Sequence, residues 1–242
     1  FGGGHAGGMR PGLERLRDTQ FGVFTARQIQ REYSRGELRA RVDRGEWVRV
    51  FHGVYREATT PASPELRVEA ARLSMGLTSV AAAYRTAAEL HGFSVLADQP
   101  TEVLGMRAAH SHRLIVHRDR VDPAELASVR GTVVTNAVRT AVDLARTLPR
   151  MDALATLDAA LRGGLSRDAL STELEKHAGR RGRGQAAELI ALADGRAESP
   201  MESRTRLRCH DAGLRVRHST QKVTRWSAGR NSLSPSFTSK VL

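Results

Sequence analysis

The chain has 242 residues, 40% of them hydrophobic, which is enough for one large domain or for two to three small ones with a sizeable core. Its net charge of +12 favours a polyanionic partner, and no apolar run approaches the roughly 18 residues that would span a membrane. The single cysteine, Cys209, excludes an internal disulfide framework and is typical of a reducing cytoplasm, where we expect the protein to act.

The positive charge is concentrated at the two ends of the chain. Residues 9–57 hold 11 arginines against seven acidic residues, and residues 201–242 hold nine basic against two acidic residues. Residues 58–200 carry the remaining net charge of only +1. We therefore expect nucleic-acid contacts at the ends and not in the middle. Residues 1–8 are rich in glycine and precede the candidate initiator Met9, so we treat them as a disordered leader outside the fold.

Two capping boxes follow each other in the first segment. In "FGVFTARQIQREY" the pair Thr25-x-x-Gln28 predicts a helix start, and in "SRGELRARVDRGE" the pair Ser34-x-x-Glu37 predicts a second one, with Gly45 ending that helix. Apolar residues at helical spacing give the two helices their inner faces: Ala26, Ile29, Tyr33, Leu38 and Val42. Two short helices with almost no linker predict a helix-turn-helix.

A predicted β-hairpin comes directly after these helices. The stretch "EWVRVFHGVYRE" is rich in strand formers, and "FHG" at 51–53 predicts a three-residue turn in which Gly53 supplies a positive φ. A hairpin behind a helix-turn-helix predicts a winged helix over residues 9–57. In that module the second helix enters the major groove of DNA and the wing contacts the backbone or the minor groove.

Six side chains are the predicted DNA contacts of this module. Arginine suits phosphates and guanine edges because its guanidinium donates two hydrogen bonds at once. The predicted contacts are Arg35, Arg39 and Arg41 on the second helix and Arg49, His52 and Arg56 on the wing. Two alternatives remain open, namely solvated arginines of a protein from a high-GC genome and a winged helix that binds another protein.

The middle of the chain predicts a mainly helical domain with a small sheet, over residues 58–197. A linker containing Pro61 and Pro64 precedes it. Predicted helices cover residues 64–76, 78–93, 135–148, 151–164, 166–179 and 184–195, and predicted strands cover 101–106, 112–119 and 131–135. The expected fold class is therefore α+β: a winged helix, this mixed domain, and an incomplete or disordered C-terminal tail.

No pattern in the chain predicts catalysis, a metal or a cofactor. His110, His112 and His117 are close in sequence but lack cysteine or carboxylate partners at a metal-binding spacing. No nucleophile elbow surrounds a serine. We expect no enzyme activity, no catalytic residue, no metal and no cofactor.

Two further segments carry a family resemblance. Together with the predicted winged helix, "SVAAAYRTAAELHGF" and "TNAVRTAVDLARTLP" resemble AbiEi-type antitoxins of abortive-infection toxin–antitoxin systems. The family patterns are close to S-H-R-x-A-A-x-L-H-G and R-T-x-x-D-L-A-R. The principal matching residues are Arg85, His91, Arg139, Thr140 and Asp143. Ala83-Tyr84 replaces the Ser-His of the first pattern, which puts any role of that pair in doubt.

The resemblance implies a function that composition does not. It implies a DNA-binding transcriptional regulator that represses its own promoter and counters a nucleotidyltransferase-like toxin, as in type IV (AbiE) toxin–antitoxin systems. Double-stranded DNA is thus the first expected partner, and the toxin is the second. A homodimer fits operators built of paired half-sites, and no membrane partner is expected.

The segment "AESPMESRTRLR" resembles the first helix of a very-short-patch-repair-like endonuclease of the PD-(D/E)XK type, with Glu202 at the family's acidic position. That chemistry needs further carboxylates for Mg²⁺, and no Asp or Glu follows Asp211. For residues 198–242 we therefore expect a truncated, inactive remnant followed by a basic tail. The tail is either native disordered sequence or out-of-frame translation, and we favour the second.

Overall fold

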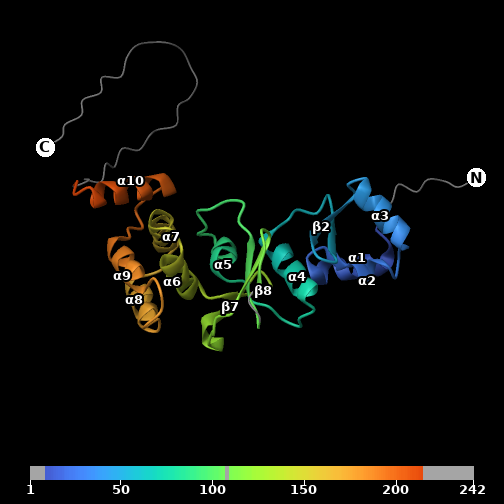
Figure 1. Cartoon of the computed structure of the whole chain (residues 1–242), viewed down its shortest axis with the longest axis horizontal. Coiled ribbons are helices and arrows are strands. Elements are labelled where there is room, and N and C mark those ends of the chain that lie inside the picture. Colours follow the sequence, from blue (N-terminus) through green and yellow to red (C-terminus); the bar gives the residue numbers. More distant parts are fainter. Residues whose placement is uncertain (1–8, 107–108, 215–242) are drawn as a thin grey trace, which may run out of the picture.

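The computed structural model describes residues 9–106 and 109–214 and confirms an α+β fold (Figure 1). The N-terminal helices lie at one end, short strands lie in the middle, and α6 to α10 gather at the other end. The predicted leader and the predicted basic tail from residue 215 lie outside the described residues. No helix among the described residues is long and apolar enough to cross a membrane.

The N-terminal module has the element order of a winged helix. Its elements are α1 (Pro11–Arg17), the 3-10 helix η1 (Asp18–Gln20), β1 (Val23–Thr25), α2 (Ala26–Ile29), α3 (Arg35–Asp43), β2 (Trp47–Phe51) and β3 (Val54–Glu57). The three strands form an antiparallel sheet in the order β1-β3-β2. The sequence did not predict β1, whose three residues are too few to show a strand period.

The hairpin turn is one residue shorter than predicted. Phe51 belongs to β2 and pairs with Val54 of β3, so that only His52 and Gly53 form the turn. Gly53 has φ +66°, as the sequence predicted. Arg49 pairs with Tyr55 and Phe51 pairs with Val54, so the register shifts by one residue between the two pairs. Because of this shift, Phe51 belongs to the strand and not to the loop.

The second part begins with a helix and a mixed sheet. Its elements are α4 (Pro64–Met75), α5 (Tyr84–His91), β4 (Thr101–Leu104), β5 (Ala109–His110), β6 (Leu114–His117), the 3-10 helix η2 (Pro123–Glu125), β7 (Leu126–Val129) and β8 (Thr132–Thr135). β4 is parallel to β6, whereas the β5–β6 and β7–β8 pairs are antiparallel. Ala82 bridges β4 and β8, which joins the two groups of strands.

The helix predicted over residues 78–93 is wrong in its first part. The alanine-rich residues before Tyr84 are extended, and the helix covers only Tyr84–His91. Ala82 donates to the carbonyl of Val133 and accepts from the amide of Thr135. These sheet bonds outweigh the helix preference of alanine, because they satisfy backbone groups that are buried at this point.

A helical layer follows the sheet. It consists of α6 (Ala137–Thr147), α7 (Arg150–Arg162), α8 (Arg167–Glu175), α9 (Arg183–Leu192) and α10 (Pro200–Asp211). The side chains of these helices, mostly leucine and alanine, form one buried cluster with Tyr84 and Ala88 of α5, and Leu207 of α10 belongs to it. The last helix thus packs on the layer, chiefly on α7.

Helix α4 lies between two hydrophobic cores. Leu66 and Ala70 pack with Val23 and Val54 of the N-terminal sheet. Val68 and Ala71, on another side of the same helix, belong to the cluster formed with the central strands. The helix therefore contributes to the N-terminal module as much as to the part that follows.

Candidate nucleic-acid interface

Both predicted capping boxes are confirmed at the atomic level. The Thr25 hydroxyl accepts from the amide of Gln28 at 3.1 Å, while the Gln28 side chain accepts from the amide of Thr25 at 2.8 Å. The Ser34 hydroxyl accepts from the amide of Glu37 at 3.2 Å, and the Glu37 carboxylate accepts from the amide of Ser34 at 2.6 Å. These bonds fix the starts of α2 and α3.

A small apolar core packs against the two helices. The cluster consists of Leu13, Phe24, Ile29, Tyr33, Leu38 and Trp47. The rings of Phe24 and Trp47 lie 5.8 Å apart at a tilt of 55°. The apolar residues Leu38 and Val42 of α3 face this core, and Arg35 and Arg39 of the same helix are exposed.

Arg35 and Arg39 lie on the solvent side of α3. Both are exposed, and Arg35 forms no ion pair within the described residues. The Arg39 side chain is 87% exposed, and its contact with Asp43 is long, at 3.9 Å. A surface pair at that distance contributes less than about 1 kcal/mol, so the Arg39 guanidinium is free to meet a phosphate or a base edge.

Arg41 is placed differently from the other two arginines of α3. Its guanidinium lies 4.9 Å from the centroid of the Tyr33 ring and donates to Glu46 at 2.8 Å. A hydrogen bond from Arg44, with help from Arg41, lowers the pKa of Glu46, so that carboxylate stays ionised. Arg41 therefore joins the end of α3 to the start of the hairpin and points less to solvent than predicted.

The three predicted wing residues also differ in exposure. Arg49 and His52 are exposed, and an Arg49 Nη2 lies 2.8 Å from the Nδ1 of His52. Arg56 is half-buried, and its Nη1 donates to the carbonyls of Glu57, Ala58 and Thr60. Arg56 thus holds the chain where it leaves the hairpin, whereas Arg49 and His52 are available to a ligand.

The first pair of family-motif residues holds the sheet to α5. Arg85 donates to the buried carboxylate of Glu102 and, at 2.7 Å, to the side-chain oxygen of Gln99. The second oxygen of Glu102 lies 2.7 Å from Nε2 of His117. His91 makes a 2.8 Å contact between its Nε2 and the carbonyl of Thr135 in β8. Neither motif residue lines the exposed face of α3.

The second group of motif residues forms a buried ion-pair network. The Arg139 Nε donates to Asp143 at 2.7 Å, and its Nη1 donates to Glu125 at 2.6 Å. Asp143 also accepts from Arg146 at 2.9 Å. The Thr140 hydroxyl donates to the carbonyl of Asn136 one turn back at 2.8 Å. All five motif residues therefore make structural contacts within the second part.

Tyr84, at the position where the family pattern has histidine, joins the first of these networks to the helical layer. Its φ of +50° lies in the left-handed region, which is uncommon for a residue with a side chain. The phenol donates to Asp119 at 2.5 Å, and the ring stacks on His117 with 4.0 Å between centroids. Burial raises the pKa of Tyr84, so the phenol stays protonated and remains a donor.

His177 lies against the second network in its neutral form. The side chain is buried, its Nδ1 lies 3.1 Å from a guanidinium nitrogen of Arg146, and its Nε2 lies 3.4 Å from Glu173. Burial lowers the pKa of His177 to about 4, because the ring is removed from water and Arg139, Arg146 and Arg180 are close by.

This shift predicts a loss of stability in acid. The unfolded chain binds the proton of His177 near pH 6.5 and the folded chain only near pH 4, so the stabilisation is complete above pH 6.5 and is lost as the pH falls toward 4. We expect the free energy of unfolding of the wild type to drop by about 3 kcal/mol more than that of His177→Gln between pH 7 and pH 4. Urea titrations at several pH values measure this, and parallel curves for the two proteins would contradict it.

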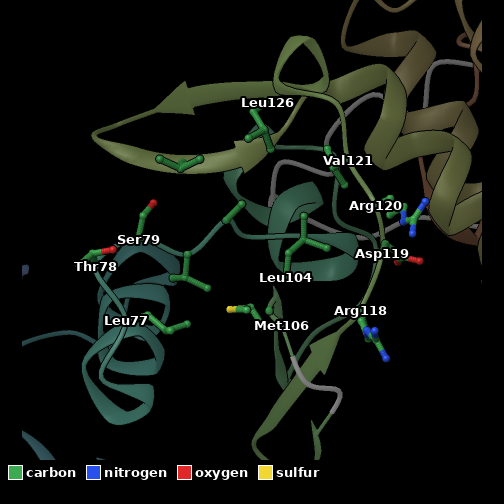
Figure 2. A pocket seen from close by; sticks show the side chains of 14 residues that line it. Leu77, Thr78, Ser79, Leu104, Met106, Arg118, Asp119, Arg120, Val121 and Leu126 are labelled. Atoms are coloured by element: carbon green, nitrogen blue, oxygen red, sulfur yellow. The ribbon is translucent and has the colours of Figure 1, made fainter.

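A cavity of about 970 Å³ opens between the central strands and the loops beside them (Figure 2). Its lining is largely apolar, with Leu77, Leu104 and Leu126 among the residues that form it. Arg118 and Arg120 lie on one side, and Thr78 and Ser79 lie on the opposite side. It is a separate feature, away from the residues predicted to contact DNA.

Glu202 serves as a cap in this structure. Ser199 accepts from the amide of Glu202 at 3.2 Å, and the Glu202 carboxylate accepts from the amide of Glu198 at 2.9 Å. Within residues 9–106 and 109–214, no group of three or more histidine, cysteine or acidic side chains could hold a metal ion. The predicted relation of this helix to an endonuclease stays a prediction.

Sequence reasoning missed one basic residue beside the wing. The Nη1 of Arg113, in the turn between β5 and β6, donates to the carbonyl of Arg49 at 3.4 Å. The two residues are 64 positions apart in sequence, and the sequence alone carried no signal that connects them.

These features define a class of protein: an α+β chain in which two short N-terminal helices and a hairpin carry several exposed basic side chains, followed by a mixed domain that contains buried ion pairs. Residues 13–58 match the family described as "Transcriptional regulator, AbiEi antitoxin", and residues 80–194 match the "AbiEi antitoxin C-terminal domain". The chain belongs to the AbiEi antitoxin family, which confirms the resemblance seen in the sequence.

Two curated relatives come from Mycobacterium tuberculosis. They are the uncharacterized protein MT2308 of strain CDC 1551 / Oshkosh and the uncharacterized protein Rv2248 of strain ATCC 25618 / H37Rv. Each is 41% identical over 186 residues, which are 75% of this chain and 66% of the relative. The chain thus spans about two thirds of their length.

A solved structure shows the same fold. The crystal structure of the RV2827C protein from Mycobacterium tuberculosis matches with a TM-score of 0.50 and 16% identity, over 85% of this chain and 81% of that one. At this identity the likeness concerns the fold alone.

Proposed function

We propose that the protein is a DNA-binding transcriptional regulator of the AbiEi antitoxin type, acting on its own promoter. The observation that carries the proposal is the exposed face of α3, where Arg35 and Arg39 have no strong partner while the apolar side of the helix is buried. The family assignment supports it, because the matching N-terminal family is described as a transcriptional regulator.

Four residues form the proposed contact set. Arg35 and Arg39 approach the major groove, where a guanidinium binds both base edges and phosphates, and Arg49 with His52 approaches the backbone beside it. Arg41 and Arg56 support the two elements that carry these contacts, through Glu46 and through the carbonyls after the hairpin. A nucleotidyltransferase-like toxin as second partner and a homodimer on paired half-sites belong to the same proposal.

Replacing both exposed arginines tests the proposal. We expect Arg35→Ala/Arg39→Ala to weaken binding to a duplex covering the promoter region by about 10–100-fold, and to make the dependence of log K on log salt shallower by about 2. Fluorescence anisotropy at several salt concentrations measures both quantities. Both side chains are exposed, so the variant should unfold at the same urea concentration as the wild type.

Arg183→Ala is the matched control. Arg183 is also an exposed arginine at the start of a helix, α9, but it lies in the helical layer at the other end of the molecule (Figure 1). Its loss should leave affinity and salt dependence unchanged. Equal affinity of the double variant and the wild type would refute the assignment of α3 as the recognition helix.

A further inference from the structure

The tip of the wing is held against the second part of the chain. Phe51 packs against the cluster around Val68 as well as against the N-terminal sheet. The Ser74 hydroxyl, from the end of α4, donates to the carbonyl of His52 at 3.0 Å. These contacts fix the position of the hairpin relative to α4 and the central strands.

The turn between β5 and β6 is closed by hydrogen bonds and contacts the wing through Arg113. The Ser111 hydroxyl accepts from the amide of Leu114 at 3.0 Å, and the amide of Ser111 donates to the carbonyl of Leu114 at 2.9 Å. These bonds close the turn and leave His112 and Arg113 at its tip, both exposed. A closed turn presents its side chains with little loss of conformational entropy on binding.

Arg113 ties this turn to the predicted interface. One of its five N–H groups is donated to the carbonyl of Arg49, so the others remain available. Arg49 in turn contacts His52, which places the four side chains Arg49, His52, His112 and Arg113 on two adjoining elements. The stretch 105–118 contains no aspartate or glutamate, so nothing within it opposes the positive charge.

We propose that the β5–β6 turn is a second DNA contact, in which His112 and Arg113 bind backbone phosphates of the duplex that flank those met by the wing. The partner is double-stranded DNA, because Arg113 of the turn contacts Arg49 of the hairpin, which is one of the proposed DNA contacts. The inference rests on the proposed function. It predicts a contact without base selectivity, since phosphates carry no sequence information.

The double variant His112→Ala/Arg113→Ala is the first test, on the full chain. We expect its affinity for the promoter duplex to fall about 3–10-fold and its salt dependence to become shallower by about 1, while its preference for promoter over unrelated DNA stays the same. Arg183→Ala again serves as the control without effect. Wild-type affinity together with wild-type salt dependence would overturn the proposal.

The outcome separates this inference from the proposed function. If Arg35→Ala/Arg39→Ala weakens binding and the turn variant does not, the regulator binds DNA without the turn, and only the inference fails. If the wild type does not bind the duplex at all, both fail.

A proximity measurement keeps the test independent of stability. An iron chelate attached at His112→Cys, in a Cys209→Ser background, should cleave the backbone at one flank of the site protected by the protein. A chelate at Arg35→Cys should cleave inside that site. Cleavage from position 35 with none from position 112 would overturn the inference.

Discussion

Replacing Arg139 with methionine is expected to lower the free energy of unfolding by about 3–5 kcal/mol. The guanidinium is 3% exposed and is the donor to one oxygen of Asp143 and one oxygen of Glu125. Methionine fills a similar volume but supplies no proton, so both carboxylates lose a charged partner while they stay buried. Arg146 still serves the second oxygen of Asp143, which limits the loss. Urea unfolding at pH 7, followed by circular dichroism, measures the change.

Arg196→Met is the matched control for this measurement. Arg196 pairs with Asp194 at 2.9 Å, but its side chain is 76% exposed, so water screens the pair and replaces it after the substitution. The expected loss is therefore much smaller than that of Arg139→Met. If Arg139→Met were as mild as Arg196→Met, the network would not be the source of stability that its burial indicates.

Leu207→Ala is expected to cost about 2–5 kcal/mol of unfolding free energy. Leu207 is fully buried in α10 and belongs to the cluster of the helical layer, so truncation leaves a cavity among the side chains of that layer. The Asp158 carboxylate beneath the same helix accepts from Arg206 at 2.5 Å and from the amide of Asp194 at 2.7 Å, which limits the collapse of the site. Thermal and urea unfolding both report the loss.

Met201 provides the comparison within the same helix. Its side chain is 65% exposed, so Met201→Ala should change the unfolding free energy by less than about 0.5 kcal/mol. If the two variants behaved alike, α10 would be an appended segment that contributes nothing to the fold. A much larger loss of unfolding free energy for Leu207→Ala than for Met201→Ala means that α10 stabilises the helical layer, whatever its relation to an endonuclease.

Short-range signals in the sequence were sufficient for the helix starts. Thr25 and Ser34 each act on a residue three positions ahead, and a bond over that distance is visible in the sequence itself. The same is true of Gly53, whose positive φ needs only the turn. The sequence therefore predicted the starts of α2 and α3 and the hairpin that follows them.

Elements that depend on distant partners were not predictable. The strand β1 exists because Phe24 pairs with Tyr55, and the extended conformation of Ala82 depends on bonds to Val133 and Thr135. Their own residues carry either too short a pattern or the wrong preference. Local composition cannot reveal a hydrogen-bonding partner that is 30 or more positions away.

The candidate site also contains features that nearby residues determine and features that distant partners determine. The exposure of Arg35 and Arg39 follows from the apolar positions of their own helix. The engagement of Arg41 by Tyr33 and Glu46, by contrast, depends on tertiary contacts that charge counting does not register. A basic side chain is a candidate contact only after its internal partners are known.

The position of α4 determines how the chain can be divided. A fragment that ended at residue 57 would lack Leu66 and Ala70, which cover Val23 and Val54 in the complete chain. A fragment that began at residue 64 would expose Leu66 and Ala70 to water. The two ends should therefore melt in a single cooperative transition. By linkage, DNA bound at one end would slow hydrogen exchange in the strands on the other side of this helix.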